Sequence, residues 1–286
     1  MLSLVAFDYA TASEFNRHSI FAWLAGMTDL EQVGFPILEF DSADAIIEPA
    51  ARQQRLDVPV AAVACFFPPL IDELVATHSG VVVASLPSLR PLQVIQWNGV
   101  PLAIFYPGMG SGLSAVVLDR VIAMGCTSIV ACGGAGALVD LPLGQVVIPS
   151  SAVRDEGASY HYLAPAREVD TAPKVLEILK AVAFDQGEPV IVGKTWTTDG
   201  FFRTTRSKLD QRVSEGCITV EMEVASLLAV AERRGIDFGQ YLYAGDNLAG
   251  TEWDHRDWTQ AVAAQKRVFN LAAGAALKLT HDLSDF

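Results

Sequence analysis

Residues 219–226 read Thr-Val-Glu-Met-Glu-Val-Ala-Ser, and the rest of the chain is best interpreted around them. The β-branched run at 217–220 predicts a strand, and the apolar, helix-favouring run at 224–231 predicts a helix. Glu221 and Glu223 therefore fall at a strand-to-helix junction among apolar neighbours. Burying a carboxylate without a partner is costly, and a vicinal diol could supply two hydrogen bonds to it. The alternative is an exposed helix start, where acids favour the helix dipole.

The composition limits the kinds of partner that we expect. The chain has 286 residues, 51% of them hydrophobic, which is enough for one large core. A net charge of −13 and a pI near 4.7 argue against binding to nucleic acid or to an anionic membrane surface. The mean hydropathy is high at +0.32, yet no apolar run reaches the ~18 residues of a membrane span. We therefore expect small-molecule partners and a homo-oligomer that buries the excess apolar surface.

Cysteine and histidine spacing predicts neither disulfides nor a metal site. The four cysteines are scattered through apolar segments and indicate buried free thiols, at Cys65, Cys126, Cys132 and Cys217. The five histidines form no pair at the i, i+4 spacing of metal ligands. The first residues lack the positive and apolar regions of a secretory signal. We expect a cytoplasmic protein without a metal or other cofactor.

Two glycine-rich segments follow predicted strands. The apolar run at 102–106 leads into Pro-Gly-Met-Gly-Ser-Gly at 107–112, before a helical run. The run at 128–132 leads into Gly-Gly-Ala-Gly-Ala at 133–137, which we expect to be a loop. Such turns aim backbone N–H groups at an anion or sugar oxygen, although glycines also serve tight turns alone. Together they predict a ligand crevice at the carboxyl edge of a sheet.

Later segments bring further candidates to the same edge. The polar and aromatic residues at 153–162 could contact a ligand or form a loop tethered by a local ion pair. Phe201 follows Asp-Gly and could lie over a planar ligand or belong to the core. The run at 238–243 predicts a last strand that delivers Asp246 to this edge, unless Asp246 is only a turn residue.

The domain organisation follows from what the chain lacks. No repeat, linker or low-complexity tract divides it, so we predict one domain over residues 1–286. Residues 1–35 could form an N-terminal arm, and residues 36–40 predict a short strand.

With these segments in order, the chain from about residue 101 to residue 279 resembles the nucleoside phosphorylase superfamily. That superfamily contains the purine nucleoside and uridine phosphorylases and related hydrolytic nucleosidases. The resemblance rests on Gly108-Met-Gly and on five further motifs. They are Cys132-Gly-Gly-Ala-Gly-Ala-Leu, Gly144-Gln-Val-Val-Ile, Arg154-Asp-Glu-Gly-Ala-Ser-Tyr-His, Thr198-Asp-Gly-Phe-Phe and Val220-Glu-Met-Glu-Val-Ala-Ser.

The resemblance implies a three-layer α/β/α fold whose mixed central sheet is partly barrel-like. It also implies assembly as a dimer, trimer or hexamer. The expected reaction is cleavage of the N-glycosidic bond of a nucleoside by phosphorolysis, with phosphate as co-substrate. Free base and ribose 1-phosphate would be the products.

Individual roles also come from the resemblance. Met222 would pack on the ribose. Glu223 would accept hydrogen bonds from the 2′- and 3′-hydroxyls of the ribose, and Glu221 would lie beside Glu223. Phe201 would stack near the base, and Asp246 would protonate or hydrogen-bond its N7, which favours purines. The remaining substrate-binding positions are Gly134, Ala135 and Gly136 behind the anomeric carbon, together with Gly108 and Met109. The candidate phosphate-binding residues are Gly110 and Arg90, of which Arg90 is a substitute for family ligands that this chain lacks.

Two departures leave the attacking group open. Phosphorolytic members place an arginine two residues before the glycine segment, where this chain has Ala131. Residues 65–69 also lack the Gly-Asp-Pro phosphate loop, so Arg90, or Arg17 of a neighbouring copy, would have to substitute. Phosphorolysis is favoured by the weight of the family alone. The alternatives are hydrolysis by water and a non-catalytic nucleoside-binding or storage protein on the same fold.

Overall fold

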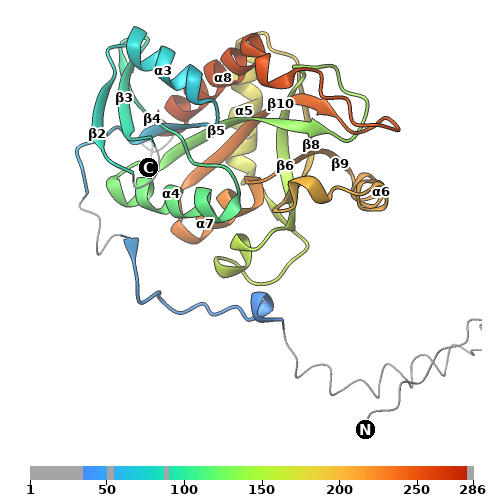
Figure 1. Ribbon diagram of the computed structural model, residues 1–286. Helices are drawn as coiled ribbons and strands as arrows, with labels where there is room; N and C mark the ends of the chain where they lie inside the picture. The colour runs from blue at the N-terminus through green and yellow to red at the C-terminus, as the bar shows by residue number, and fades with distance from the viewer. Residues whose placement is uncertain (1–34, 50–54, 87–89, 282–286) are drawn as a thin grey trace, which may run out of the picture. The chain divides into compact units, whose positions relative to one another are not determined.

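The computed structural model describes residues 35–49, 55–86 and 90–281 (Figure 1). Contacts divide the chain into two units, Met1–Glu39 and Phe40–Phe286. In the described part of the first unit, a 3₁₀ turn, η2 (Pro36–Leu38), replaces the strand predicted at 36–40. Pro36 presets a helical φ, and Glu39 N donates to its carbonyl. Most of the suggested N-terminal arm lies outside the described residues, so that suggestion and the single-domain interpretation stay predictions.

The second unit is built on one mixed sheet of ten strands. Its strand order is β10-β6-β8-β9-β5-β1-β4-β3-β2, with β7 beside β6. The strands are β1 (Ala61–Cys65), β2 (Val81–Ala84), β3 (Leu92–Trp97), β4 (Val100–Phe105), β5 (Ser128–Ala137), β6 (Val146–Asp155), β7 (Glu168–Asp170), β8 (Val190–Thr198), β9 (Cys217–Glu221) and β10 (Asp237–Asn247).

Part of this sheet closes on itself. β10 pairs in parallel with β5 and antiparallel with β6. The path β10-β6-β8-β9-β5 therefore returns to β10 and forms a small barrel, while β1 to β4 extend from it as an open sheet. This arrangement confirms the mixed, partly barrel-like sheet expected from the resemblance.

Helices cover both faces of the sheet, as the α/β/α prediction requires (Figure 1). One face packs against α3 (Pro68–Thr77), α5 (Pro173–Asp185) and α8 (Val262–His281). The other face packs against α4 (Ser111–Met124) and α7 (Val224–Arg234). A sixth described helix, α6 (Arg206–Ser214), lies beside β9. All four cysteines are buried and free, as predicted.

The glycine-rich segment at 133–137 belongs to a strand and was wrongly expected to be a loop. β5 continues through it because both of its edges are paired. Gly134 lies in register with Tyr243 of β10, and Gly136 with Val220 of β9. By contrast, the Asn-Gly turn between β3 and β4 forms as its sequence predicts, with positive φ at both Asn98 and Gly99.

The polar stretch at 153–162 is tethered internally. Its first residues finish β6, and its last form the 3₁₀ turn η3 (Ala158–His161). Arg154 is buried and donates to Ser159 Oγ and to the Ala164 carbonyl. The stretch is therefore tethered and does not line the cavity described below, but its tether consists of hydrogen bonds and not of the expected local ion pair.

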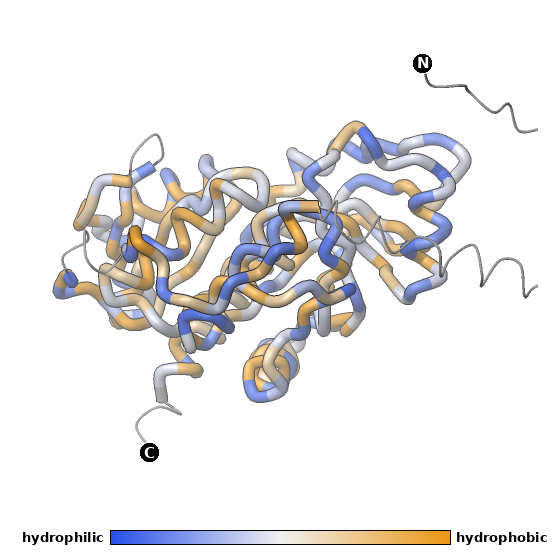
Figure 2. The backbone as a smooth tube through the Cα atoms, turned by 90° about the horizontal axis from the view of Figure 1, so that it is seen from below, coloured by the Kyte–Doolittle hydropathy of each residue, from blue (hydrophilic) through white to orange (hydrophobic). Residues whose placement is uncertain are grey.

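Hydrophilic and hydrophobic residues are interspersed along the backbone of the described chain (Figure 2). None of the helices in the described ranges combines the length and the apolar character needed to cross a membrane.

Candidate active site

A cavity of about 380 Å³ opens where the carboxyl ends of several strands meet the starts of α4 and α7. Its lining comes from chain segments far apart in sequence. These residues are Phe66, Phe67, Tyr106, Met109, Gly133, Gly134, Ala135, Gly136, Thr198, Phe201, Phe202, Thr204, Val220, Glu221, Met222, Glu223, Gln240, Asp246, Leu248, Trp253 and Trp258.

The strand-to-helix junction predicted at 219–226 is present, with β9 ending at Glu221 and α7 beginning at Val224. Both acids are only 7% exposed, which rules out the alternative of an exposed helix start. The two carboxylates nevertheless have different surroundings.

Glu221 organises the start of α7. Its Oε2 accepts hydrogen bonds from the backbone N–H of Glu223 at 2.6 Å and of Val224 at 2.7 Å. Its Oε1 accepts from the Thr197 hydroxyl at 2.5 Å. Burial raises the pKa of Glu221, while these three donors oppose that rise. Glu221 lines the cavity as expected, but its oxygens already hold the helix N-terminus in place.

Glu223 faces the cavity with fewer protein partners. Its Oε1 accepts from the backbone N–H of Gly110 at 2.6 Å. Burial raises the pKa of Glu223, and the negative charge of Glu221 raises it further. A ligand hydroxyl donating to this carboxylate would stabilise its ionised form.

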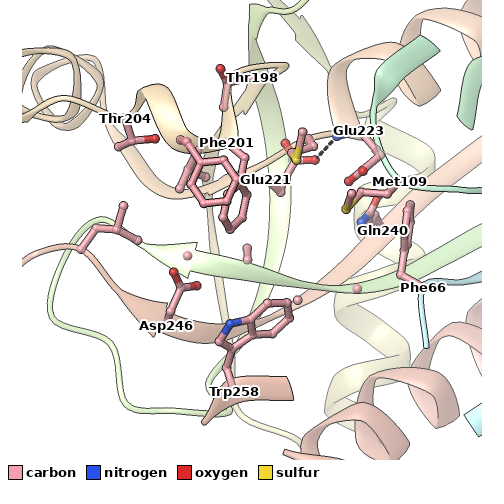
Figure 3. Close-up of a pocket in the computed structure, with 18 of the residues that line it drawn as sticks. Phe66, Met109, Thr198, Phe201, Thr204, Glu221, Glu223, Gln240, Asp246 and Trp258 are labelled. Atoms are coloured by element: carbon pink, nitrogen blue, oxygen red, sulfur yellow. Dashed lines mark hydrogen bonds between the residues drawn. The ribbon is translucent and has the colours of Figure 1, made fainter. Parts of the chain in front are cut away.

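An aromatic region surrounds Asp246 at one end of the cavity (Figure 3). The half-buried Asp246 accepts a hydrogen bond from Trp253 Nε1 at its Oδ2, with a distance of 2.6 Å. Phe201 is 48% exposed, so it is not the core residue of the alternative interpretation. Phe201, Asp246 and Trp258 thus enclose a space bounded by flat apolar surfaces and one carboxylate.

Two glycines of β5 permit close approach at this end. A Cβ on Gly134 would lie 3.2 Å from Trp258 Cζ3. A Cβ on Gly136 would lie 2.6 Å from Leu248 Cδ1 and 3.3 Å from Asp246 Oδ1. The glycine motif therefore keeps the wall of the cavity at the level of the backbone.

The opposite end of the cavity holds Phe66, Met109, Gln240 and Glu223 (Figure 3). Tyr106 also lines it, and its pKa is raised by burial and by the charge of Glu223. Tyr106 is therefore a neutral phenol at neutral pH and can donate a hydrogen bond.

Three predicted residues do not line the cavity. Gly108 has φ +87, and a Cβ on it would contact Leu113 at 2.6 Å, so its role is to form the turn. Gly110 precedes α4, but its N–H is directed at Glu223 instead of at a phosphate position. Arg90 forms an ion pair with Asp72 of α3. Neither expected phosphate ligand therefore faces the cavity in this structure.

The other predicted positions, Met109, Gly134, Ala135, Gly136, Phe201, Met222, Glu221, Glu223 and Asp246, all line the one cavity. Sequence reasoning missed Gln240, Trp253 and Trp258. Gln240 had a usable signal, because it is a lone amide in an otherwise apolar strand run. The two tryptophans lie in a segment with no periodic pattern, and only the fold brings them to the cavity.

Comparison with known proteins agrees with this geometry. A sequence profile described as the Phosphorylase superfamily matches residues 61–283. Guanosine phosphorylase from Halorubrum lacusprofundi is 27% identical over 153 residues, covering 53% of this chain but only 64% of that relative.

Two solved structures share the fold. Purine nucleoside phosphorylase from Toxoplasma gondii superposes with a TM-score of 0.71 at 19% identity, covering 84% of this chain and 99% of that one. AMP nucleosidase from Bacteroides thetaiotaomicron superposes with a TM-score of 0.64 at 20% identity, covering 82% and 94%. Given the profile match over residues 61–283 and the shared fold, this chain belongs to the phosphorylase superfamily.

Proposed function

We propose that this protein is an enzyme that cleaves the N-glycosidic bond of a purine nucleoside with water as the attacking group. The observation that supports water as the attacking group is the charge of the residues that line the cavity. Its charged lining residues in the described part of the chain are the three carboxylates Glu221, Glu223 and Asp246.

The two ends of the cavity suit the two halves of a nucleoside. A heterocycle fits among Phe201, Trp258 and Asp246, and the diol of a ribose fits at Glu223. The volume of about 380 Å³ is in the range of ligand pockets. The preference for purines rests on Asp246, and on Thr205 and Ser207 standing where uridine-specific members of the family use Gln and Arg.

The chemistry follows from this placement. As the bond between C1′ and the base breaks, its electron pair goes to the base, and the Asp246 carboxyl group donates a proton to the base nitrogen. Positive charge grows on the ribose ring, and the hydrogen bonds of its hydroxyls to Glu223 strengthen accordingly. Water then bonds to C1′ and releases a proton to solvent, while Asp246 regains one.

Water suits this cavity better than phosphate does. Phosphate is a dianion at neutral pH and is normally held by bidentate arginines or by several backbone N–H groups. Here Ala131 replaces the arginine, Gly110 N–H is bonded to Glu223, and Arg90 is paired with Asp72. A neutral nucleophile avoids repulsion from the buried carboxylates.

Phosphorolysis is the second candidate. The guanosine phosphorylase relative favours phosphorolysis by its name. The positive charge of Arg90 also acts on Tyr106 in the cavity, where it partly opposes the rise in the pKa of that phenol. The shared fold decides nothing here, since a phosphorylase and a nucleosidase both adopt it.

Product analysis separates the candidates. The protein is incubated with inosine, guanosine, adenosine and uridine, with and without added phosphate. We expect free base and free ribose from a purine nucleoside, at a rate that phosphate does not change. Ribose 1-phosphate formed only when phosphate is present would refute hydrolysis. Tight nucleoside binding without any product would indicate a binding protein.

The role of Asp246 has its own test. We expect Asp246→Ala to lower kcat/KM for the best purine nucleoside by ~10²-fold or more, because the leaving base loses its proton donor. Asp210→Ala, an exposed position on α6, serves as the control and should leave the rate unchanged. Equal rates in the two variants would remove Asp246 from the mechanism.

A further inference from the structure

Gln240 is a buried amide that the rest of the site does not explain. It lies in β10, is 3% exposed, and lines the cavity. Its Oε1 is buried and has no hydrogen-bond partner among the described residues. Buried polar atoms without partners are few in folded proteins, and one that belongs to a residue lining a ligand cavity invites a ligand explanation.

The position of Gln240 in the sheet indicates which part of the site it serves. In the parallel pairing of β10 with β5, Gln240 lies in register with Ala131. By the resemblance to phosphorolytic members of the family, position 131 is where an arginine would be expected, and this chain has Ala131 there. Gln240 therefore places a neutral polar side chain on the strand next to Ala131.

Gly133 leaves room for the side-chain amide of Gln240 beside the cavity. A Cβ on Gly133 would lie 3.3 Å from Gln240 Nε2 and 3.3 Å from a ring carbon of Phe66. Any larger residue at 133 would therefore press on Gln240. Figure 3 places Gln240 at the end occupied by Glu223 and Met109, away from Asp246 and Phe201. With the base at Asp246 and the diol at Glu223, this is the end from which C1′ is attacked.

We propose that Gln240 holds the attacking water. Its Oε1 accepts one O–H of the water, which turns a lone pair of the water oxygen toward C1′. After the C1′–N bond has broken, the C1′–O bond forms, and the second proton of the water leaves to solvent. This inference rests on the hydrolytic function proposed above. A neutral amide satisfies a neutral nucleophile, whereas it cannot offset the charge of a phosphate dianion.

A variant that keeps the shape of this side chain tests the inference. Gln240→Met has nearly the same length and no polar end. Because the Oε1 makes no bond within the described protein, we expect the Tm of the free protein to be unchanged or raised. We expect kcat to fall by ~10-fold to ~100-fold with KM within about 3-fold, because the water loses its orientation while the nucleoside keeps its contacts.

A second readout reports on the nucleophile directly. Added methanol competes with water for C1′ and forms a methyl riboside. We expect Gln240→Met to raise the ratio of methyl riboside to ribose, since methanol does not need the amide and water does. Gln145→Met is the matched control, because Gln145 donates to the carbonyls of Val146 and Pro189 outside the cavity. It should leave kcat and the methanol ratio unchanged.

The outcomes separate this inference from the proposed function. If the wild-type protein releases ribose without phosphate but Gln240→Met keeps its kcat and methanol ratio, the water-holding role is wrong and hydrolysis stands. If the wild-type protein forms ribose 1-phosphate and Gln240→Met raises the KM for phosphate, both fail together, and Gln240 is a phosphate ligand.

Discussion

At the residue scale, the acids Glu221 and Glu223 lie two residues apart but have different surroundings. Glu221 is saturated by the hydroxyl of Thr197 and by two backbone N–H groups, and so belongs to the framework. Glu223 receives Gly110 N–H on one oxygen and faces the cavity. The difference arises from which way each side chain leaves the junction, because a strand residue and a residue preceding a helix point in different directions.

The raised pKa of Glu223 predicts opposite effects on stability and activity. The pKa of Glu223 is near 4.5 in the unfolded chain and higher in the folded chain. Such a carboxyl contributes its full stabilisation of the fold when the pH is below its unfolded pKa. This stabilisation is lost as the pH rises through the folded pKa. Glu223→Gln removes the titration, so between pH 5 and pH 8 its Tm should fall less than that of the wild-type protein.

Activity should change in the other direction. In the proposed reaction the ionised carboxylate accepts hydrogen bonds from the ribose diol. The kcat/KM of the wild-type protein should therefore rise with pH through the raised pKa of Glu223. We expect Glu223→Gln to lower kcat/KM by ~10²-fold and to abolish that rise. Thermal unfolding and initial rates across the pH range check both effects. A variant with wild-type rates would show that Glu223 does not bind the substrate.

At the element scale, the β9–α7 junction is held by a neighbouring strand. Thr197 of β8 donates to Glu221 Oε1 and accepts from the backbone N–H of Ala225 at 3.0 Å. One hydroxyl thus connects the end of β8, the end of β9 and the first turn of α7. This connection fixes Glu223, which lies between β9 and α7, relative to the cavity.

We expect Thr197→Val to destabilise the protein by about 1–3 kcal/mol, because it leaves a buried carboxylate oxygen and a buried N–H without partners. It should also lower kcat, since the start of α7 is no longer fixed. Thr195→Val is the control on the same strand, where the hydroxyl makes a single bond of 3.3 Å to the Thr219 carbonyl. Denaturant unfolding should show the larger loss for Thr197→Val. Equal losses would contradict the bridging role.

At the scale of the whole molecule, apolar side chains surround the mouth of the cavity. Met109 is 70% exposed, Phe202 90% and Trp253 56%, and all three line the cavity. Together with a mean hydropathy of +0.32, they support the expectation that copies of this chain associate. The net charge of −13 opposes association only through repulsion that salt screens.

We therefore predict that light scattering after gel filtration gives a mass of at least twice the 30.7 kDa of one chain. Raising the salt concentration should leave that mass unchanged or raise it, because apolar contact is strengthened and charge repulsion is screened. A single species at the mass of one chain would show that the oligomer prediction is wrong.

The sequence by itself determined most of the order of the elements and the resemblance to the superfamily. Strand and helix periodicity, the Asn-Gly turn and the Glu-Met-Glu junction are local patterns, so they could be read without coordinates. It also indicated that Phe201, Glu223 and Asp246 lie at one edge, because strand ends in an α/β sheet meet there.

Tertiary structure alone decided what those residues face. The closure of β10 onto β5 turned an expected glycine loop into a paired strand and placed Gln240 beside Ala131. The tertiary fold also pairs Arg90 with Asp72 and brings Trp253 and Trp258 to the end of the cavity that holds Asp246. These contacts join residues distant in the chain, and their energies depend on packing and burial that no local pattern encodes.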